Sequence, residues 1–454
     1  MNQSSLSHPL EELELQAMPA LGRTVNFGNA LEAPNEGDWG ITLEAEYFRL
    51  AKEAGFQSIR LPISWTHHTA SSSPYTIDPS FFSRIDWAID QAKRNGLKII
   101  INDHHHDELN NNPQAERARY LAIWQQIAER YQGYGAFLYF ELLNEPHGAF
   151  NTNPALWNEI MTQALNVVRQ TNPTRKVIVG PVYWNSIGSL ADLVLPESDR
   201  NLFVTVHFYS PFEFTHQGAE WVSPVPPVGV KWWGDVTALA ALWDNYSWDT
   251  SINWRRSKSP SVQITFNQGW AGFYVHRESP WTGVDTLQFS VDTALELFIN
   301  CGNDHGIPFS TQAGWHTYTL ALSECGTGSN QDIFIQNATP SPKGPFLLRN
   351  FKLLGPNNKV ISILSNEKGQ IRQSFSLVKS WSRTNRRPIF VGEFGAYNKA
   401  DMDSRIRWTR SVRETAESYS FAWAYWEFAA GFGIYDPQAG NFRQGLLEAL
   451  IPPQ

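Results

Sequence analysis

The sequence predicts a (β/α)8 barrel, an α/β fold of the TIM type, interrupted by an inserted antiparallel β-sandwich. Three observations predict this architecture. Apolar strand-like runs alternate with helical periodicity as far as residue 207, the same pattern resumes at residue 388, and short alternating runs fill the interval. Eight apolar strands separated by helices favour a closed parallel barrel over an open sheet. A dinucleotide-binding fold would require a Gly-x-Gly-x-x-Gly motif after the first strand, and the sequence has no such motif there.

The expected barrel elements follow one another in order. Each strand is a short apolar run, and each helix has apolar residues three and four positions apart. Expected strands lie at 24–29, 57–61, 98–101, 137–142, 177–179, 202–207, 388–393 and 421–427. Expected helices lie at 42–54, 81–94, 115–131, 155–170, 189–195, 370–383 and 406–418.

The middle of the chain has a different pattern. Short alternating runs separated by turn residues lie at 261–266, 286–291, 295–299, 315–322, 332–336 and 345–353. None has helical periodicity, which indicates an antiparallel, jelly-roll-like sandwich. We therefore expect barrel strands one to six in 1–242, the sandwich in 243–355, and strands seven and eight in 356–454. One elaborate loop is the alternative, although so long a loop rarely has its own hydrophobic alternation.

Composition excludes several classes of protein. The chain has 454 residues, 36 Lys plus Arg and 44 Asp plus Glu, for a net charge of −8. This charge argues against a nucleic-acid partner, and no apolar stretch is long enough to span a membrane. Residues 1–21 lack the apolar run of an export signal, so the chain is expected to be cytoplasmic as written, or secreted if a signal was removed. The two cysteines, Cys301 and Cys325, form either one bridge or two free thiols.

Two glutamates follow opposite barrel strands. Asn144-Glu145-Pro146 ends strand four, and Gly392-Glu393-Phe394-Gly395 ends strand seven. Barrel active sites form at these carboxyl ends, where strands four and seven face each other. Glycoside hydrolysis needs two such carboxylates, one as acid and one as nucleophile or base. Mutual repulsion would raise one pKa and keep that group protonated.

These two motifs resemble the signatures of glycoside hydrolase family 5, a family of retaining (β/α)8 enzymes of clan A. Three further runs, 28–39, 211–221 and 423–427, resemble a bacterial subfamily of endoglucanases that also accept mannan and glucomannan. The resemblance covers nearly the whole barrel. It implies nothing about the inserted sandwich.

The resemblance implies a role for each matching residue. Glu145 corresponds to the acid/base and Glu393 to the nucleophile. Four further catalytic positions match: Arg60 and Tyr209 beside the nucleophile, Asn144 at the sugar 2-hydroxyl, and His207 as a polar neighbour. Expected substrate contacts are Asn26, Glu32, His104, His105, His216, Trp221 and Trp426. His106 stands where relatives often have Tyr, so it is left out of the site.

The run His104-His105-His106, with Asp103 and Asp107 beside it, has the side chains of a metal site. Consecutive residues that leave a strand point in different directions, and no Glu-x-x-His or Cys partner has ligand spacing. We expect no metal and no cofactor.

The leading hypothesis is a retaining endo-β-1,4-glucanase, whose partner is a β-glucan chain. An endo-β-1,4-mannanase, or an enzyme of dual specificity, is the alternative within the same class. A non-catalytic polysaccharide-binding protein is the alternative from another class, although it has no need for the full catalytic set. The sandwich is expected to be a carbohydrate-binding module or a structural insert. Its candidate aromatics are Trp248, Trp254, Trp270, Trp281 and Trp315.

Overall fold

The computed structural model describes residues 21–234, 237–238, 244–253, 261–276, 283–302, 306–325, 331–363 and 365–453. The chain divides into two compact units, Met1–Lys231 with Phe375–Gln454, and Trp232–Ser374. The predicted sandwich, 243–355, lies within the second unit. Trp254 and Trp281 lie outside the described residues. So do residues 1–20, which form nearly all of the N-terminal segment considered as an export signal.

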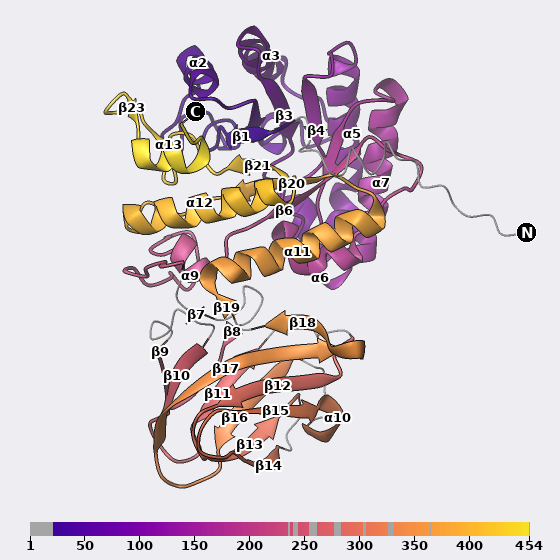
Figure 1. Ribbon diagram of the computed structural model, residues 1–454. Coiled ribbons are helices and arrows are strands. Elements are labelled where there is room, and N and C mark those ends of the chain that lie inside the picture. Colours follow the sequence, from indigo (N-terminus) through magenta and orange to yellow (C-terminus); the bar gives the residue numbers. More distant parts are fainter. Residues whose placement is uncertain are drawn as a thin grey trace, which may run out of the picture. The chain divides into compact units, whose positions relative to one another are not determined.

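The first unit is a closed barrel of eight parallel strands, as predicted (Figure 1). The strands are β1 (Arg23–Asn26), β2 (Ser58–Leu61), β3 (Lys98–Asn102), β4 (Leu138–Glu141), β5 (Val177–Val179), β6 (Leu202–His207), β20 (Ile389–Phe394) and β21 (Ala422–Tyr425). They pair in that order, and β21 returns to β1 with Val25 opposite Tyr425. Every residue of β2, β4, β6 and β20 is buried, and each of these strands is mainly apolar with one or more polar or charged side chains.

Helices surround the barrel strands in Figure 1. The longer ones are α2 (Ala45–Glu53), α3 (Pro79–Arg94), α5 (Pro113–Tyr131), α7 (Pro154–Thr171), α11 (Glu367–Asn385), α12 (Met402–Ser418) and α13 (Gln444–Leu450). Three of them begin with proline and are capped by the preceding Asp78, Asn112 or Asn153, whose side chain accepts a backbone N–H. A proline loses no hydrogen bond at this position, and the cap satisfies a free donor.

Several short elements were not predicted. They are α4 (Asp107–Asn111), α6 (Ala149–Thr152), α8 (Val182–Asn185), α9 (Phe212–Thr215) and the 3-10 turn η1 (Thr66–His68). The helix predicted at 189–195 is instead the 3-10 helix η2 (Ile187–Asp192), in which Ser186 caps the backbone N–H of Gly188. Such short segments carry too few turns for a periodic pattern. Among the described residues, no helix has the length and apolar character needed to cross a bilayer.

The second unit contains two antiparallel sheets. The β17 sheet has the order β15-β12-β17-β10-β9, with β18 paired to β17, and the β11 sheet has the order β14-β13-β16-β11-β8. The strands of the β17 sheet are β9 (Thr250–Asn253), β10 (Ser261–Phe266), β12 (Thr286–Val291), β15 (His316–Ala321), β17 (Lys343–Gly355) and β18 (Lys359–Ile363). Those of the β11 sheet are β8 (Asp244–Asn245), β11 (Gly272–His276), β13 (Glu296–Asn300), β14 (Ile307–Ser310) and β16 (Asp332–Asn337).

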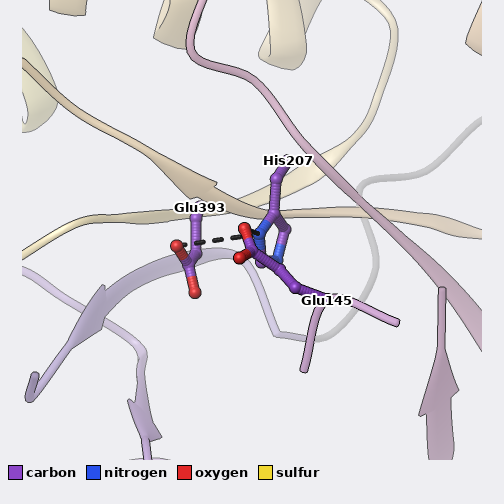
Figure 2. Close-up of side chains that lie close together, drawn as sticks. All are labelled: Glu145, His207 and Glu393. Carbon is purple, nitrogen blue, oxygen red and sulfur yellow. Dashed lines mark hydrogen bonds and ion pairs between the residues drawn. The ribbon is translucent and has the colours of Figure 1, made fainter. Parts of the chain in front are cut away.

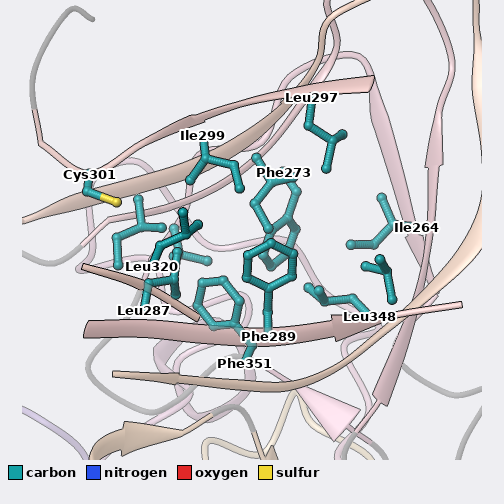
Figure 3. Close-up of a cluster of buried hydrophobic side chains, with 14 of the residues drawn as sticks. Ile264, Phe273, Leu287, Phe289, Leu297, Ile299, Cys301, Leu320, Leu348 and Phe351 are labelled. Atoms are coloured by element: carbon teal, nitrogen blue, oxygen red, sulfur yellow. The ribbon is translucent and has the colours of Figure 1, made fainter. Parts of the chain in front are cut away.

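The two sheets share one hydrophobic core (Figure 3). Phe273 and Leu297 come from the β11 sheet, whereas Phe289 and Leu348 come from the β17 sheet, and all four are fully buried or nearly so. Alternating burial along strands such as β16 places every second residue in this core. The sandwich architecture is therefore confirmed.

A disulfide bond and a short pair of strands constrain the second unit. Cys301 and Cys325 form a disulfide, which settles the pairing that the sequence left open; Cys325 ends the short helix α10 (Leu322–Cys325). The short strands β7 (Thr237–Ala238) and β19 (Ser365–Asn366) pair with each other. This pairing brings together the beginning and the end of the unit, as an insertion into a single barrel connection requires.

Candidate active site

A buried guanidinium occupies the centre of the barrel mouth. Arg60 has no exposed surface, and its Nε and Nη2 atoms donate to Glu141 at 2.6 and 2.8 Å. Nη1 donates to Glu393 at 2.7 Å and to Asn26 at 2.8 Å, and Nη2 also donates to Asn144 at 2.7 Å. A buried cation is tolerated only when its donors are paired in this way. Arg60, on β2, thus contacts side chains from β1, β20 and β4 or the residues that follow it.

Glu393 is the penultimate residue of the buried strand β20, and both of its carboxylate oxygens accept hydrogen bonds. Oε1 accepts from Arg60, and Oε2 accepts from the Tyr209 hydroxyl at 2.9 Å. Burial raises the pKa of Glu393, while the charges of His207 and Arg60 act in the opposite direction. Both donors stabilise the ionised carboxylate, because a hydrogen bond to the charged form favours that form. Burial also raises the pKa of Tyr209, so its hydroxyl stays a donor.

Glu145 follows β4 in a left-handed backbone conformation, with φ at 49°. Its Oε1 lies 2.6 Å from Nδ1 of His207, and Figure 2 shows the imidazole beside the two carboxylates. Burial raises the pKa of Glu145 to about 7, although 24% of its side chain remains exposed. One oxygen of Glu145 and one of Glu393 lie within 4.8 Å of each other. The two glutamates therefore face a common space, and they differ in their partners: Glu393 is paired with Arg60, whereas Glu145 lies beside His207.

His207 is the polar neighbour of both carboxylates. Its Nδ1 also lies 3.6 Å from Oε2 of Glu393. Burial lowers the pKa of His207 to about 4, so the ring is neutral near pH 7. Asn185 places its Nδ2 atom 3.2 Å from Nε2 of His207. With Asn185 as the donor, the ring proton resides on Nδ1 and points to Glu145.

Two histidines of the 104–106 run, His104 and His106, have different hydrogen-bond partners. His104 lies 3.1 Å from Nδ2 of Asn102, and His106 lies 2.6 Å from Asp103. In the described part of the chain, the group of acidic and histidine ligands close enough to share an ion is instead Glu145, His207 and Glu393. That donor set is a poor fit for a cation, because the Arg60 charge already binds Glu393.

Among the expected substrate contacts, Trp221 is exposed, whereas Trp426, His105 and His216 are half-buried, and a buried set comprises Asn26, Glu32 and His104. Trp426 stacks on His104 with ring centroids 5.5 Å apart, and His105 contacts the exposed Trp39. His216 and the exposed Trp221 lie together, 6.4 Å between ring centroids. These aromatic groups come from different loops.

Asn26 and Glu32 belong to the buried set. Asn26 donates to the backbone oxygens of Gly392 and Tyr425 while it accepts from Arg60. Glu32 accepts backbone N–H groups of the loop before it, and burial raises its pKa to about 8. Both side chains are therefore buried and hydrogen-bonded within the protein.

Three residues of the site were not predicted. Glu141 is a single acid within the apolar strand β4, and its position inside the barrel was the signal that could have found it. Asn185 ends a run of three left-handed residues, Tyr183 to Asn185, that no sequence pattern indicates. The exposed Trp184 stacks on His147 at 5.0 Å, and His147 Nδ1 lies 2.6 Å from the backbone oxygen of Glu145. Trp184 thus lies near the side of the site that holds Glu145.

Comparison with protein families gives one match. The model described as "Cellulase (glycosyl hydrolase family 5)" matches residues 22–261. Among curated proteins, Endoglucanase H of Acetivibrio thermocellus is 40% identical over 197 residues, which are 43% of this chain and 22% of that protein. Endoglucanase 3 of Fibrobacter succinogenes is 22% identical over 98% of this chain and 54% of its own length. The chain spans from 22% to 59% of the first three curated relatives.

Solved structures match more of the chain. A structure described as an endoglucanase is 33% identical, covers 96% of this chain and 98% of its own, and has a TM-score of 0.65. Cel5A of Thermotoga maritima in complex with cellobiose is 33% identical over 95% of this chain and 97% of its own, with a TM-score of 0.64. Its complex with mannotriose has the same identity, coverage and TM-score.

The Arg60–Glu141 pair leads to a test of stability. Glu141→Ala leaves a buried guanidinium short of one charge partner and should lower the free energy of unfolding of the barrel by about 3–5 kcal/mol. Hydrogen exchange of strands β2 and β4, followed by mass spectrometry, reports this opening separately from the second unit. Glu53→Ala, which removes an exposed partner of Arg49, is the control and should leave exchange nearly unchanged. Equal exchange in both variants would contradict the structural role of the pair.

Proposed function

This chain belongs to glycosyl hydrolase family 5, and from that premise we propose that it is an endo-β-1,4-glucanase that acts by a retaining double displacement. One observation carries the proposal. Glu145 and Glu393 approach within 4.8 Å across the barrel mouth, with distinct partners on each. Retaining enzymes separate their carboxyl groups by about 5–5.5 Å, whereas inverting enzymes need about 6.5–9.5 Å to admit a water molecule. The short approach supports retention.

In the first step, a carboxylate oxygen of Glu393 attacks the anomeric carbon of the bound sugar. The bond from that carbon to the glycosidic oxygen breaks, and Glu145 transfers its proton to the departing oxygen. The products are a covalent glycosyl ester on Glu393 and a shortened chain with a free hydroxyl. Arg60 and Tyr209 hold Glu393 in place and keep it ionised before attack.

In the second step, Glu145 is a carboxylate and accepts a proton from water. The water oxygen attacks the anomeric carbon, the ester bond to Glu393 breaks, and the sugar leaves with its original configuration. His207 donates from Nδ1 to Oε1 of Glu145 in this assignment, which leaves the other oxygen to exchange the proton. Asn144, 2.7 Å from Arg60, is positioned to contact the sugar 2-hydroxyl.

The proposed substrate is a β-1,4-linked glucan, because the relatives reported above are named endoglucanases and one was solved with cellobiose. The mannotriose complex of the Thermotoga protein favours dual specificity as a second candidate. Trp426 would stack on the sugar at the point of cleavage, and Trp184 would stack on the leaving-group side. A non-catalytic polysaccharide-binding protein would have no need for the full set of Glu145, Glu393, Arg60, Asn144 and Tyr209, which hydrolysis uses.

The substrate proposal is tested by comparing polymers side by side. Carboxymethylcellulose and lichenan should release reducing sugar faster than mannan at equal mass concentration, because the proposed natural substrate is glucan. Comparable rates on mannan would establish the dual enzyme, and hydrolysis of mannan alone would refute the glucanase proposal. Glu393→Gln serves as the blank for each polymer.

The raised pKa of Glu145 predicts a pH profile. The first step requires protonated Glu145, whose pKa of about 7 means that kcat/KM on glucan oligosaccharides should fall as pH rises through about 7. The measurement is kcat/KM from pH 4 to 9 in buffers of constant ionic strength. An aryl cellobioside with a strongly activated leaving group needs little protonation, so its profile should lose most of the alkaline decline. The same decline on both substrates would refute Glu145 as the acid.

Single substitutions separate the two carboxylates. Glu145→Gln should lower kcat/KM on unactivated glucan by about 10²–10⁴-fold while largely sparing glycosylation by the activated aryl cellobioside. Glu393→Gln should abolish turnover of both, because no covalent intermediate can form. Burst kinetics measure the glycosylation step directly. A burst of normal amplitude in Glu393→Gln, or equal loss of the burst in both variants, would overturn these roles.

A further inference from the structure

The outward face of the β11 sheet is aromatic. On β11 and β16, Phe273 and Ile335 point into the core, whereas Tyr274 and Phe334 alternate with them and are only partly buried. Tyr274 and Phe334 are directly opposite in register, with ring centroids 5.6 Å apart. On the next strand, β13, the partly buried Phe298 alternates with the buried Leu297 and Ile299 and lies opposite Gln336 of β16. Three adjacent strands thus place an aromatic ring on one surface.

Further rings from the adjoining loops extend this surface. Trp248 lies 5.7 Å from Phe334, and Tyr246 stacks on His276 at 4.8 Å. Trp270 stacks near Phe298 at 6.4 Å. A Cβ added to Gly272 would lie 2.3 Å from the Trp248 ring, so glycine there allows the indole to rest on the strand. Tyr246 and Trp270 are the most open members, 53% and 49% exposed.

We call this surface the aromatic face. It comprises Tyr246, Trp248, Trp270, Tyr274, His276, Phe298, Asp332, Phe334 and Gln336.

The aromatic face is polar at its edges, and the residues that define it include no Lys or Arg. None of the residues of β8, β11, β13, β14 and β16 is Lys or Arg. The carboxylate of Asp332 accepts from the Tyr274 hydroxyl at 2.7 Å and lies 2.6 Å from Nδ1 of His276. Gln336 contributes an amide beside Trp270, to whose backbone oxygen it donates at 2.8 Å. A surface of this kind matches an uncharged ligand with hydroxyl groups and does not match a polyanion.

The other sheet presents a different surface. Outward positions of the β17 sheet include Gln263, Gln288 and Thr319, and its strands also carry Lys343 and Lys352. The exposed Trp315 at its margin is covered by the guanidinium of Arg349, 3.7 Å from the ring centroid. Among the described residues of the sandwich, the two most exposed rings, Tyr246 and Trp270, therefore both lie on the aromatic face.

We propose that the aromatic face binds a neutral β-linked polysaccharide chain. Rings in a row match the flat C–H faces of successive sugars, and Asp332, His276 and Gln336 supply hydrogen-bond partners for equatorial hydroxyl groups. The choice of a β-glucan as the polymer rests on the proposed function. Binding here would hold the polymer on the same molecule as the catalytic barrel and raise its local concentration without changing the chemistry.

The proposal is tested on the full-length chain in a Glu393→Gln background, so that the polymer is not degraded. Tyr246→Ala/Trp270→Ala removes the two most open rings, and Trp315→Ala removes an exposed tryptophan from the other sheet as the matched control. Affinity electrophoresis in gels containing lichenan, hydroxyethylcellulose or glucomannan gives the dissociation constants. The double variant should bind at least tenfold more weakly, while Trp315→Ala should bind as the parent does.

Two controls accompany the binding measurement. One distinguishes weaker polymer binding from loss of folding, and the other distinguishes failure of this proposal from failure of the glucanase proposal. With Glu393 restored, the double variant should hydrolyse a short aryl cellobioside at the parent rate, which shows that the barrel is intact. Retardation by a gel polymer is scored whether or not that polymer is hydrolysed. Unchanged binding in the double variant, or an equal loss in Trp315→Ala, would overturn the proposal. Retardation by polygalacturonate instead of the neutral polymers would overturn it as well.

Discussion

The candidate site depends on one buried cation. The Arg60 guanidinium has no exposed surface and reaches Glu141 on β4, Glu393 on β20 and Asn26 on β1. Burying an isolated ion costs several kcal/mol even after the protein relaxes, so its partners are needed as much as the ion itself. Because these partners lie on separate strands, the same charge that pairs with Glu393 also binds the strand ends together. The same hydrogen bonds of Arg60 thus hold the candidate site and the barrel interior together.

From this arrangement follows the difference between the two glutamates. Glu393 receives two strong donors, Arg60 and Tyr209, whereas Glu145 has the neutral His207 and retains contact with solvent. Burial raises the pKa of both, but only Glu393 has a permanent cation bound to its carboxylate. This difference supports the proposal that a proton shared between the two resides on Glu145. Two identical side chains obtain different roles from their surroundings.

Much of this arrangement could be predicted from sequence, because barrel geometry converts strand order into position. Asn144-Glu145 and Gly392-Glu393 follow strands four and seven, so a closed barrel brings them together. Burial and backbone conformation could not be predicted in the same way. The hydrogen bonds that Asn26 and Glu32 make within the protein, and their burial, were not predicted. Asn185 reaches His207 only because three successive residues adopt left-handed conformations.

The sandwich shows the same limit. Alternation predicted most strands of the β17 sheet, but β11 contains Gly272 and β14 contains Pro308, and both weaken the pattern. Alternation also does not tell which face of a strand is buried until its neighbours are known. The aromatic face could not be predicted from sequence, because it depends on the pairing that makes the strands of Tyr274, Phe334 and Phe298 neighbours.

The central claim is that Glu393 forms a covalent bond to the sugar. Incubation with an activated 2-deoxy-2-fluoro cellobioside, which slows hydrolysis of the glycosyl ester more than its formation, tests this claim most directly. Mass spectrometry of the intact chain and of its peptides should find one added fluorocellobiosyl group, attached to Glu393 and absent from Glu393→Gln. An adduct on another residue would contradict the account, as would release of product with inverted configuration by an enzyme that forms no adduct.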